Sequence, residues 1–509
     1  MTTRHELEQQ VDALLGDEQG TLYGDGEFRV AMVYPSPYRV GMSSLGYQTI
    51  YRQLNQMDDV QCERAFLPDD VAAYRSSRTS LFTFETKTNV ADADVVAFSI
   101  AYEIEMIGLL DCFDLAGMPA RAADRGDGWP LVVFGGPLTF SNPLPVAPFC
   151  DVMVMGEGEE LIRIIVERWR GATDRQTFLE QMAKLPGMYV PSIHGERLMP
   201  VAQAADVELP AHSAIVTPNT ELASMHLVEN ARGCHRGCTF CVMRRTTNGG
   251  MRAVEPARVL ATIPDHARRV GLVGAATSDH PQILEILRAI VDSDREVGLS
   301  SLRADRMTRE FVELLARGGA RSLTVASDGS SRRMRKLAKK SIRDEHLMEC
   351  ARLVRDVGLR HLKLYMVIGY PEETMEDIEE MIEFVGELST VCKVALGMSP
   401  LVAKKNTPLD GVAFENSKSL ERKIKAVHKG LGRDVDIRST SVRWSWIEYQ
   451  VAQGGWDMAD VAEQAWRDGA SYAAWKKAVR ELGRERAPLR RPVDERLRQG
   501  ALLSGADLI

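Results

Sequence analysis

Three cysteines with close, unequal spacing lie near the middle of the chain. Cys234, Cys238 and Cys241 form a C-x3-C-x2-C pattern, and the aromatic Phe240 directly precedes the last of them. The apolar segment 225–229 comes shortly before them and predicts a buried strand that ends in a Gly-containing loop. Three thiolates suit a [4Fe–4S] cluster. Because a cubane has four irons, three protein ligands leave one iron open to bind a substrate or cofactor.

Two other interpretations of these cysteines are weaker. A structural zinc site needs four ligands, which commonly come from two C-x2-C pairs. His235 could complete a set of three cysteines and one histidine, but it is crowded between Cys234 and Cys238. A redox pair of Cys238 and Cys241 would leave Cys234 without a role. The spacing therefore favours the iron–sulfur cluster.

The composition is typical of a globular protein with several domains. A chain of 509 residues, with 45% hydrophobic and 26% charged residues, is expected to form about two to four domains. No apolar run approaches the ~18–20 residues of a membrane span, and the polar segment 1–20 lacks the apolar core of a secretory signal. The net charge of −8 argues against a general nucleic-acid-binding surface.

The eight cysteines do not indicate a disulfide scaffold in a chain of this length. Five of them lie apart from the trio and are expected to be buried and inert: Cys62, Cys112, Cys150, Cys350 and Cys392. Free thiols and an oxygen-sensitive cluster predict a reducing, cytoplasmic location.

Residues 26–170 alternate between apolar and amphipathic segments. The expected strands are 28–34, 60–66, 94–100, 130–134 and 151–155. The expected helices between and after them are 45–55, 103–116 and 161–170. Apolar strands separated by helices predict a doubly wound parallel sheet of the flavodoxin or Rossmann type. Ligands of such sheets bind at the carboxyl ends of the strands.

The same alternation resumes over residues 223–410. The expected strands are 225–229, 271–273, 296–302, 322–326, 361–368 and 391–398. Six strand–helix units predict a partial (β/α)6 TIM barrel, with its site at the carboxyl ends of the strands. The remaining segments are an expected helical extension (1–25), a linker (171–222), a small helical cap that holds five of the seven tryptophans (411–482) and a mobile tail (483–509).

The pattern C-x3-C-x-aromatic-C after a first strand resembles the radical SAM superfamily. The resemblance implies that the open iron binds the amino and carboxylate groups of S-adenosylmethionine (SAM). One electron then cleaves SAM to methionine and a 5′-deoxyadenosyl radical, and this chemistry belongs to the cofactors. An external electron donor such as flavodoxin or ferredoxin is implied as a partner.

The resemblance also implies a set of SAM contacts at strand ends. These are Phe240, Gly274, Ala275, Ala276, Thr277, Ser300, Ser301, Arg303, Asp328, Ile368 and Gly369. Two positions depart from the superfamily pattern, because 274–277 contains no Glu and Asp328 stands where relatives often have the longer Glu. Seven Lys and Arg residues in 332–343 form either a solvated helix face or a contact for an anionic ligand.

The loops of the first domain resemble those of the cobalamin-binding domain in one class of these enzymes. The positions implied to contact the corrin are Tyr38, Gly41, Ser99, Gly135, Gly136, Gly156, Glu157 and Gly158. No D-x-H-x-x-G occurs before residue 223, so cobalamin is expected without a lower His ligand. The alternative is a flavodoxin-like domain that binds no corrin.

These features predict a radical SAM enzyme, with cobalamin-dependent methylation of an unactivated carbon as the expected reaction. The substrate is expected to be a small or lipid-like molecule, with no nucleic-acid partner. Rearrangement, cyclisation or another C–H functionalisation without corrin is one alternative, and a non-catalytic iron–sulfur or corrinoid-sensing protein is another. Sulfur insertion is disfavoured because the first domain has no second cysteine trio.

Overall fold

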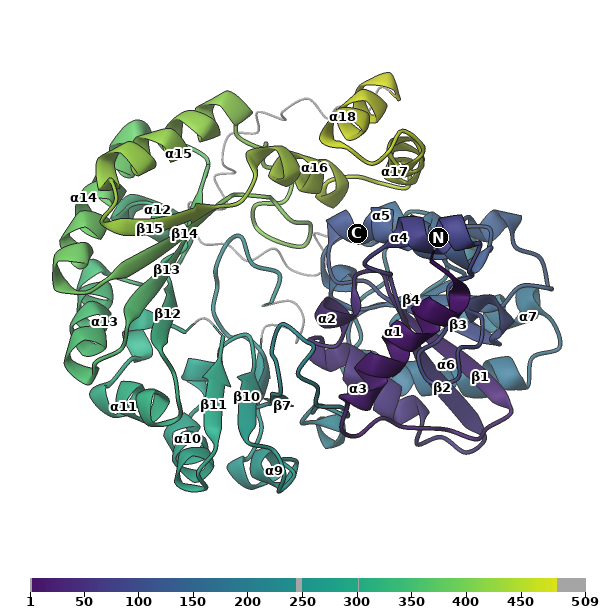
Figure 1. Cartoon of the computed structure of the whole chain (residues 1–509). Coiled ribbons are helices and arrows are strands. Elements are labelled where there is room, and N and C mark those ends of the chain that lie inside the picture. The colour runs from purple at the N-terminus through teal and green to yellow at the C-terminus, as the bar shows by residue number, and fades with distance from the viewer. Residues whose placement is uncertain (1, 244–249, 301, 483–509) are drawn as a thin grey trace. The chain divides into compact units, whose positions relative to one another are not determined.

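The computed structural model describes residues 2–243, 250–300 and 302–482, and it divides into two compact units (Figure 1). Of the described residues, those in 2–228 and 454–482 form the first unit and those in 229–453 form the second, so the division falls within the strand β7 (His226–Glu229), which is described below with the sheets of the second unit. The predicted tail 483–509 and Ser301 lie outside the described residues. Among the described residues, no helix is both long and apolar enough to cross a membrane.

The first unit is built on a six-stranded sheet in the order β2-β1-β3-β4-β5-β6. Its parallel strands are β1 (Phe28–Tyr34), β2 (Val60–Phe66), β3 (Val95–Ser99), β4 (Leu131–Gly135) and β5 (Val152–Val154). The short β6 (Met188–Tyr189) adds antiparallel to β5. The predicted doubly wound sheet is confirmed, and its order reverses between β1 and β3, which is where such sheets bind ligands.

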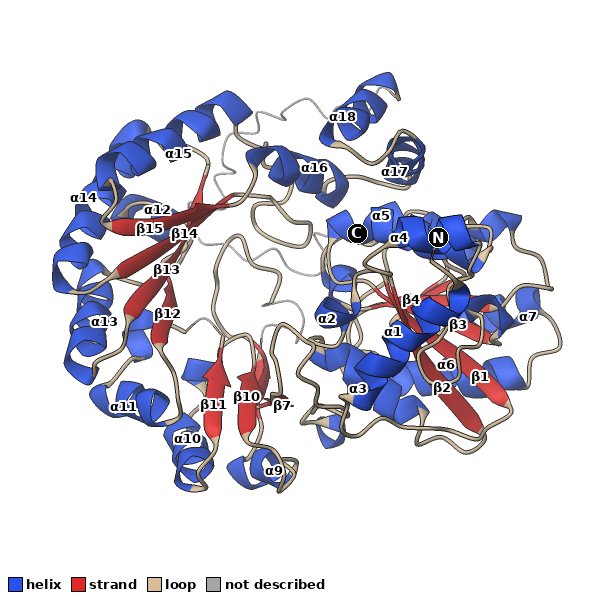
Figure 2. Cartoon of the chain, viewed as in Figure 1, coloured by secondary structure: helices blue, strands red, loops and turns tan. Residues whose placement is uncertain are grey.

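Helices flank this sheet (Figure 2). They are α1 (Arg4–Gly16), α2 (Tyr38–Gly41), α3 (Leu45–Leu54), α4 (Val71–Ser77), α5 (Met106–Ala116), α6 (Glu159–Arg170), α7 (Arg175–Met182) and α8 (Pro191–His194). In α6 the buried residues Ile162, Ile165 and Val166 recur at the spacing that makes one apolar face of a helix. The strands read as continuous apolar runs because helices cover both faces of the sheet.

The first unit also contains two helices from the end of the described chain, α17 (Asp457–Arg467) and α18 (Tyr472–Glu481). Arg121 pairs with Asp460 at 2.7 Å and with Glu463 at 2.6 Å, and the indole of Trp466 donates to Asp111 at 2.8 Å. The expected helical cap 411–482 is therefore divided between the two units. Helical periodicity marks an apolar face but does not say which partner covers it.

The second unit carries two parallel sheets that together form a half-barrel. One has the order β11-β10-β7 and the other β12-β13-β14-β15. The strands are β7 (His226–Glu229), β10 (Arg269–Val273), β11 (Glu296–Leu299), β12 (Ser322–Ala326), β13 (His361–Ile368), β14 (Val394–Pro400) and β15 (Val435–Ser439). A parallel bridge between Leu302 and Val325 links the two sheets. The predicted partial barrel is confirmed, and β15 adds a strand inside the segment that was expected to be helical.

Helices cover the outer face of this half-barrel (Figure 1). They are α9 (Pro256–Ala261), α10 (Ile283–Asp292), α11 (Arg309–Arg317), α13 (Asp344–Val357), α14 (Met375–Val391) and α15 (Ser417–Leu431). The unit also contains α12 (Arg332–Leu337), which follows β12, and α16 (Val442–Ala452), which follows β15. Alternate residues of β13 such as Leu362 and Leu364 are fully buried, whereas Tyr365 is exposed. The strand thus packs one face against the helices and turns the other towards the barrel interior.

Candidate cluster and cofactor site

The cysteine trio lies after β7, in the segment between two short antiparallel strands, β8 (Ala231–Gly233) and β9 (Met251–Ala253). All three thiols are free and half-buried. Thr239, between the second and third cysteines, donates its backbone N–H to the carbonyl of Ala338 at 3.0 Å, just after α12. The loop is therefore anchored to the wall of the half-barrel.

The donor set fits a cluster better than a single metal ion. Among the described residues, no three His, Cys, Asp or Glu side chains meet around one ion position. A cubane instead takes one thiolate on each of three irons. Burial raises the pKa of the Cys241 thiol to about 11, so the iron's own charge would have to favour the thiolate.

The loop after β10 supports the strand that leads to the cysteines. A Cβ added at Gly274 would lie 2.9 Å from the carbonyl oxygen of Ala231, so only glycine fits there without a shift. Ala275 is exposed, whereas Ala276 and Thr277 are buried. The Thr277 hydroxyl donates to the Gly274 carbonyl at 3.2 Å and lies 3.3 Å from Asn230 Oδ1. Of the predicted SAM contacts at 274–277, only Ala275 is exposed.

The predicted SAM contact Arg303 is already engaged within the chain. Its Nε and Nη2 donate to the two carboxylate oxygens of Asp305 at 3.0 and 2.9 Å, and Nη2 also reaches Ser341 Oγ at 3.1 Å. Ser300, at the end of β11, is exposed. A SAM carboxylate would have to share the Arg303 guanidinium with Asp305.

Asp328 is paired with Lys340, which the sequence analysis identified only as part of the basic segment 332–343. The Lys340 ammonium donates to Asp328 Oδ2 at 2.5 Å, and both side chains are largely buried. Asp328 has a left-handed backbone (φ 55°), and its carbonyl accepts the Tyr370 hydroxyl at 2.8 Å. Burial raises the pKa of Cys238, whereas the nearby Lys340 lowers it. This ion pair therefore belongs to the surroundings of the cluster.

The rest of the basic segment is mostly neutralised by carboxylates. Arg332 and Arg335 pair with Asp344, and Arg333 pairs with Asp377 at 2.5 Å. Exposed positions remain at Lys336 and Lys339. The basic segment is thus largely a set of ion pairs, with Lys336 and Lys339 exposed, whereas Lys340 pairs with Asp328.

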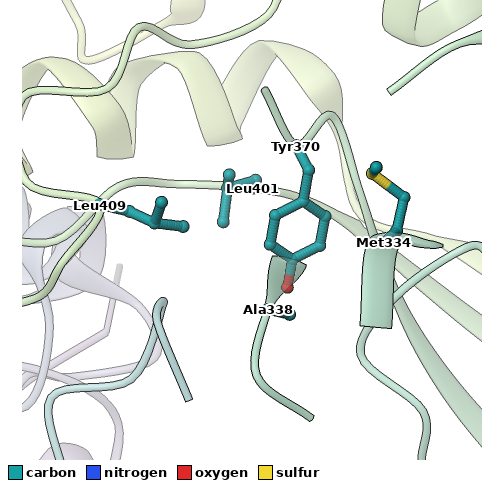
Figure 3. Packing of buried hydrophobic residues seen from close by; sticks show 5 residues of the cluster. All are labelled: Met334, Ala338, Tyr370, Leu401 and Leu409. Carbon is teal, nitrogen blue, oxygen red and sulfur yellow. The ribbon is translucent and has the colours of Figure 1, made fainter. Parts of the chain in front are cut away.

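Phe240 packs on a small apolar cluster, defined by Met334, Ala338, Tyr370, Leu401 and Leu409 (Figure 3). Its ring meets that of Tyr370 edge to face, with centroids 6.4 Å apart. This contact fixes the aromatic side chain immediately before Cys241 and gives it a packing role.

Buried charged side chains hold the loop after β13 in place. Gly369 has φ 87°, and its N–H donates to Glu373 Oε2 at 2.6 Å. The Lys423 ammonium bonds to Glu373 at 2.9 Å and to Glu415 at 2.7 Å. The Ile368 side chain is fully buried, and its carbonyl accepts from the Leu401 N–H at 2.7 Å. Lys423 lies 50 residues from Glu373 along the chain, so no local sequence pattern indicates this support.

In the first unit, two predicted corrin contacts have packing roles. Tyr38 is buried, stacks on Phe84 at 5.4 Å and donates its hydroxyl to Glu18 at 2.7 Å. A Cβ at Gly41 would lie 2.6 Å from the Phe66 ring, so this glycine lets α2 approach β2.

Three further positions lie at the carboxyl ends of β3 and β4. A Cβ at Gly136 (φ 100°) would lie 2.6 Å from the Ile100 carbonyl oxygen and 3.1 Å from Ser99 Oγ. Among the residues that the structure describes, an added Cβ at Gly135 would meet only the Val154 Cβ, at 4.0 Å. Gly136 is therefore required by the chain itself, whereas the position of Gly135 is open.

The Gly-Glu-Gly-Glu loop after β5 is filled by the chain's own segment 201–204. Gly156 (φ 93°) pairs with Ala202, and its Cβ would lie 2.6 Å from the Ala202 carbonyl oxygen. Glu157 accepts from the Ala204 N–H at 2.9 Å, and Gly158 precedes α6. Sequence patterns gave no sign of this pairing, which joins residues about 46 positions apart and depends on the folded linker.

Glu105 is a buried carboxylate that sequence reasoning did not single out, and it lies where the strand order of this sheet reverses. Glu105 accepts from the Ser36 hydroxyl at 2.9 Å and from the Ala101 N–H at 2.6 Å. It thereby ties the loop after β1 to the loop after β3. Burial raises the pKa of Glu105 to about 7.

Comparisons with known proteins agree with this architecture. Residues 46–191 match the family described as radical SAM proteins, N-terminal, and residues 229–385 match the radical SAM superfamily. An uncharacterised protein of Methanocaldococcus jannaschii is 25% identical over 417 residues, covering 80% of this chain and 84% of the relative. An uncharacterised methyltransferase of Pyrococcus horikoshii is 25% identical over 272 residues, covering 51% of this chain and 58% of the relative.

Two solved structures share the fold. TsrM from Kitasatospora setae, a radical S-adenosylmethionine methyltransferase solved with cobalamin and a [4Fe–4S] cluster, superposes with a TM-score of 0.52 at 15% identity, covering 76% of each chain. OxsB, a cobalamin-dependent S-adenosylmethionine radical enzyme, has a TM-score of 0.51 at 15% identity, covering 71% of this chain and 52% of that one. Both matching family models describe radical SAM proteins, and together they match more than half of the chain. The chain therefore belongs to the radical SAM superfamily, whose enzymes use a [4Fe–4S] cluster and SAM.

Proposed function

We propose that this protein is a cobalamin-dependent radical SAM methyltransferase that acts on an unactivated carbon of a small or lipid-like molecule. The observation that carries the proposal is the combination of a doubly wound sheet with a radical SAM half-barrel in one chain. TsrM and OxsB have this combination, and the names of both structures include cobalamin.

In this proposal Cys234, Cys238 and Cys241 hold the cluster. When bound, the cluster and SAM supply a radical that abstracts hydrogen from the substrate, with the electron coming from an external donor. Lys340 is the cation best placed to share a SAM carboxylate, because its ammonium has three donors and, among the described residues, bonds only to Asp328. Arg303 makes two bonds to Asp305 and thereby orients the segment after β11.

In the first unit, cobalamin would lie at the carboxyl ends of the strands and would supply the transferred methyl group when bound. Gly135 leaves open space at the end of β4, and Ser99 lies beside it at the end of β3. Glu105 and Ser36 fix the two loops where the strand order reverses. The loop 34–41 contains no His, so the proposed binding lacks a lower His ligand.

Sulfur insertion at a second cluster is not favoured by the first unit. Cys62 lies on β2 and Cys150 directly precedes β5, with three strands between them in the sheet, and Cys112 lies in α5. Each of these thiols is fully buried, and burial raises the pKa of each well above its usual range.

The test uses the full-length chain, purified without oxygen and reconstituted with iron and sulfide. The protein is incubated with hydroxocobalamin, desalted and examined for corrin absorbance. It is then given SAM and a strong reductant, and 5′-deoxyadenosine is measured. Gly135→Val should lower corrin retention, because its methyl groups would fill the open space at the end of β4. Gly126→Val is the matched control, since a Cβ there meets nothing within 4 Å.

Retained corrin together with 5′-deoxyadenosine is the expected result. The nucleoside without corrin would contradict methylation and favour rearrangement or cyclisation. An intact cluster with neither would favour a non-catalytic iron–sulfur or corrinoid-sensing protein.

A further inference from the structure

Asp279 is a buried carboxylate surrounded by cations. Its side chain is 0% exposed. Arg236 donates to both of its oxygens, from Nε at 2.9 Å and from Nη2 at 2.7 Å, and Arg306 Nε donates at 2.8 Å. Arg303 Nε and His235 Nε2 lie within 4.0 and 3.9 Å. Burial opposes ionisation, but the bonds from Arg236 and Arg306 hold the pKa of Asp279 below its usual range.

These groups come from three different loops. His235 and Arg236 lie between the first two cysteines of the trio. Arg303 and Arg306 belong to the segment after β11, where η8 spans Ala304–Arg306. Asp279 ends η7 (Thr277–Asp279), in the loop after β10. One carboxylate therefore joins the cysteine loop to two of the loops that the resemblance assigned to SAM.

We infer that Asp279 is a positioning residue that holds the C-x3-C segment of the cluster loop in register with the loops after β10 and β11. Arg236 is two residues from both Cys234 and Cys238, so its bidentate bond restrains both cysteines. The inference rests on the proposed binding of a cluster by this trio.

The same geometry has an electrostatic consequence for the cluster. Arg236, Arg303 and Arg306 carry three positive charges, and Asp279 and Asp305 carry two negative ones, which leaves one net positive charge. Removing the Asp279 charge makes this group more positive, whereas removing the Arg236 charge makes it less positive. Local charge helps to set the reduction potential of an iron–sulfur cluster, so the two changes should shift that potential in opposite directions.

The experiment compares Asp279→Asn and Arg236→Gln in the full-length, reconstituted protein. Both variants should keep the wild-type iron content. Asp279→Asn should shift the cluster potential to more positive values and Arg236→Gln to more negative values in a titration followed by electron paramagnetic resonance. Both should weaken the spectral change caused by SAM and lower 5′-deoxyadenosine formation, by up to about 10²-fold for a misplaced reacting group.

Asp292→Asn is the matched control, because Asp292 also pairs with an arginine, Arg317 at 2.7 Å, but is 61% exposed. This variant should leave every readout unchanged. An unshifted potential and an unchanged SAM response in Asp279→Asn would overturn the inference. The inference would also be overturned if Asp279→Asn lost its iron while Arg236→Gln kept its iron content, potential and SAM response. Asp279 would then be needed only for folding. The two variants could shift the cluster potential in opposite directions while neither they nor the wild type cleave SAM. That result would reject the proposed function and retain the positioning role of Asp279.

Discussion

Side chains around Cys238 have opposing effects on the pKa of its thiol. Burial raises the pKa of Cys238, and Asp328 raises it further, whereas Lys340 and Arg303 lower it. Burial also dominates at Cys241. A thiolate at these positions therefore depends on the metal's charge, and each ligand is expected to be needed for cluster assembly.

Replacing Cys238 with Ala should abolish the cluster, because two remaining thiolates cannot hold three irons of the cubane. Iron and sulfide per chain should fall to near zero after reconstitution. Cys392→Ala is the control, since Cys392 is a half-buried thiol outside the trio, and its iron content should equal that of the wild type. A Cys238→Ala chain with full iron content would contradict the assignment.

The raised pKa of Glu105 makes stability depend on pH. Its folded-state pKa is about 7, whereas a glutamate in an unfolded chain titrates near about 4.3. The folded chain binds this proton more tightly, so the contribution to the free energy of unfolding is full below about pH 4 and is lost as pH rises to about 7. Glu105→Gln should flatten this dependence by at most about 1.4 kcal/mol per pH unit.

Urea unfolding at about pH 5 and about pH 7 measures this effect for both chains. The wild type should lose more stability than Glu105→Gln over that interval. The same loss in both chains would show that Glu105 is not protonated in the folded state near pH 6.

At the scale of elements, local patterns predict those parts of the fold that have a clear period. The strands at 28–34, 60–66, 322–326 and 361–368 have the predicted bounds, because continuous or alternating apolar residues mark them and turn residues end them. β15 was missed because it is a short, mostly exposed segment at the sheet edge that carries the charged residues Asp436 and Arg438.

Side-chain partners across the fold were harder to predict than elements. The trio of cysteines follows from spacing within eight residues. The Asp279 contacts instead combine three loops, and Glu157 meets a segment about 47 residues away. Such pairs depend on tertiary arrangement, which a single sequence does not encode locally. Gly136 and Gly156 were predicted as ligand contacts, whereas close approach to the chain's own backbone explains their small size.

Gly136→Ala should destabilise the first unit, by on the order of 1–3 kcal/mol for strained backbone. The residue has φ 100°, and an added Cβ would lie 2.6 Å from the Ile100 carbonyl oxygen. Gly126→Ala should change the thermal midpoint little, because a Cβ there meets nothing within 4 Å. Equal midpoints for the two variants would contradict this account of the β4 loop.

At the scale of the whole chain, segments that are far apart in the sequence belong to the same unit. Residues 454–482 return to the first unit after the half-barrel is complete. There α17 packs on α5 and on η5 (Leu144–Phe149), and α18 packs on α17. The first unit is therefore assembled from both ends of the described chain.

A chain truncated after Gln453 should consequently have a less stable first unit. It would lose the Arg121 ion pairs and the bond from Trp466 to Asp111, and would expose the apolar surface beneath α17. A chain ending at Leu482 keeps every one of these contacts and serves as the control. Limited proteolysis should cut the shorter chain faster within the first unit, and equal rates would contradict the assignment of 454–482 to it.

The most direct test of the account as a whole is the formation of 5′-deoxyadenosine. The full-length, reconstituted protein is mixed with SAM and a strong reductant without oxygen, beside Cys238→Ala and Cys392→Ala. The account predicts the nucleoside from the wild type and from Cys392→Ala, and none from Cys238→Ala. A wild-type chain with an intact cluster and bound SAM that yields no nucleoside would contradict it.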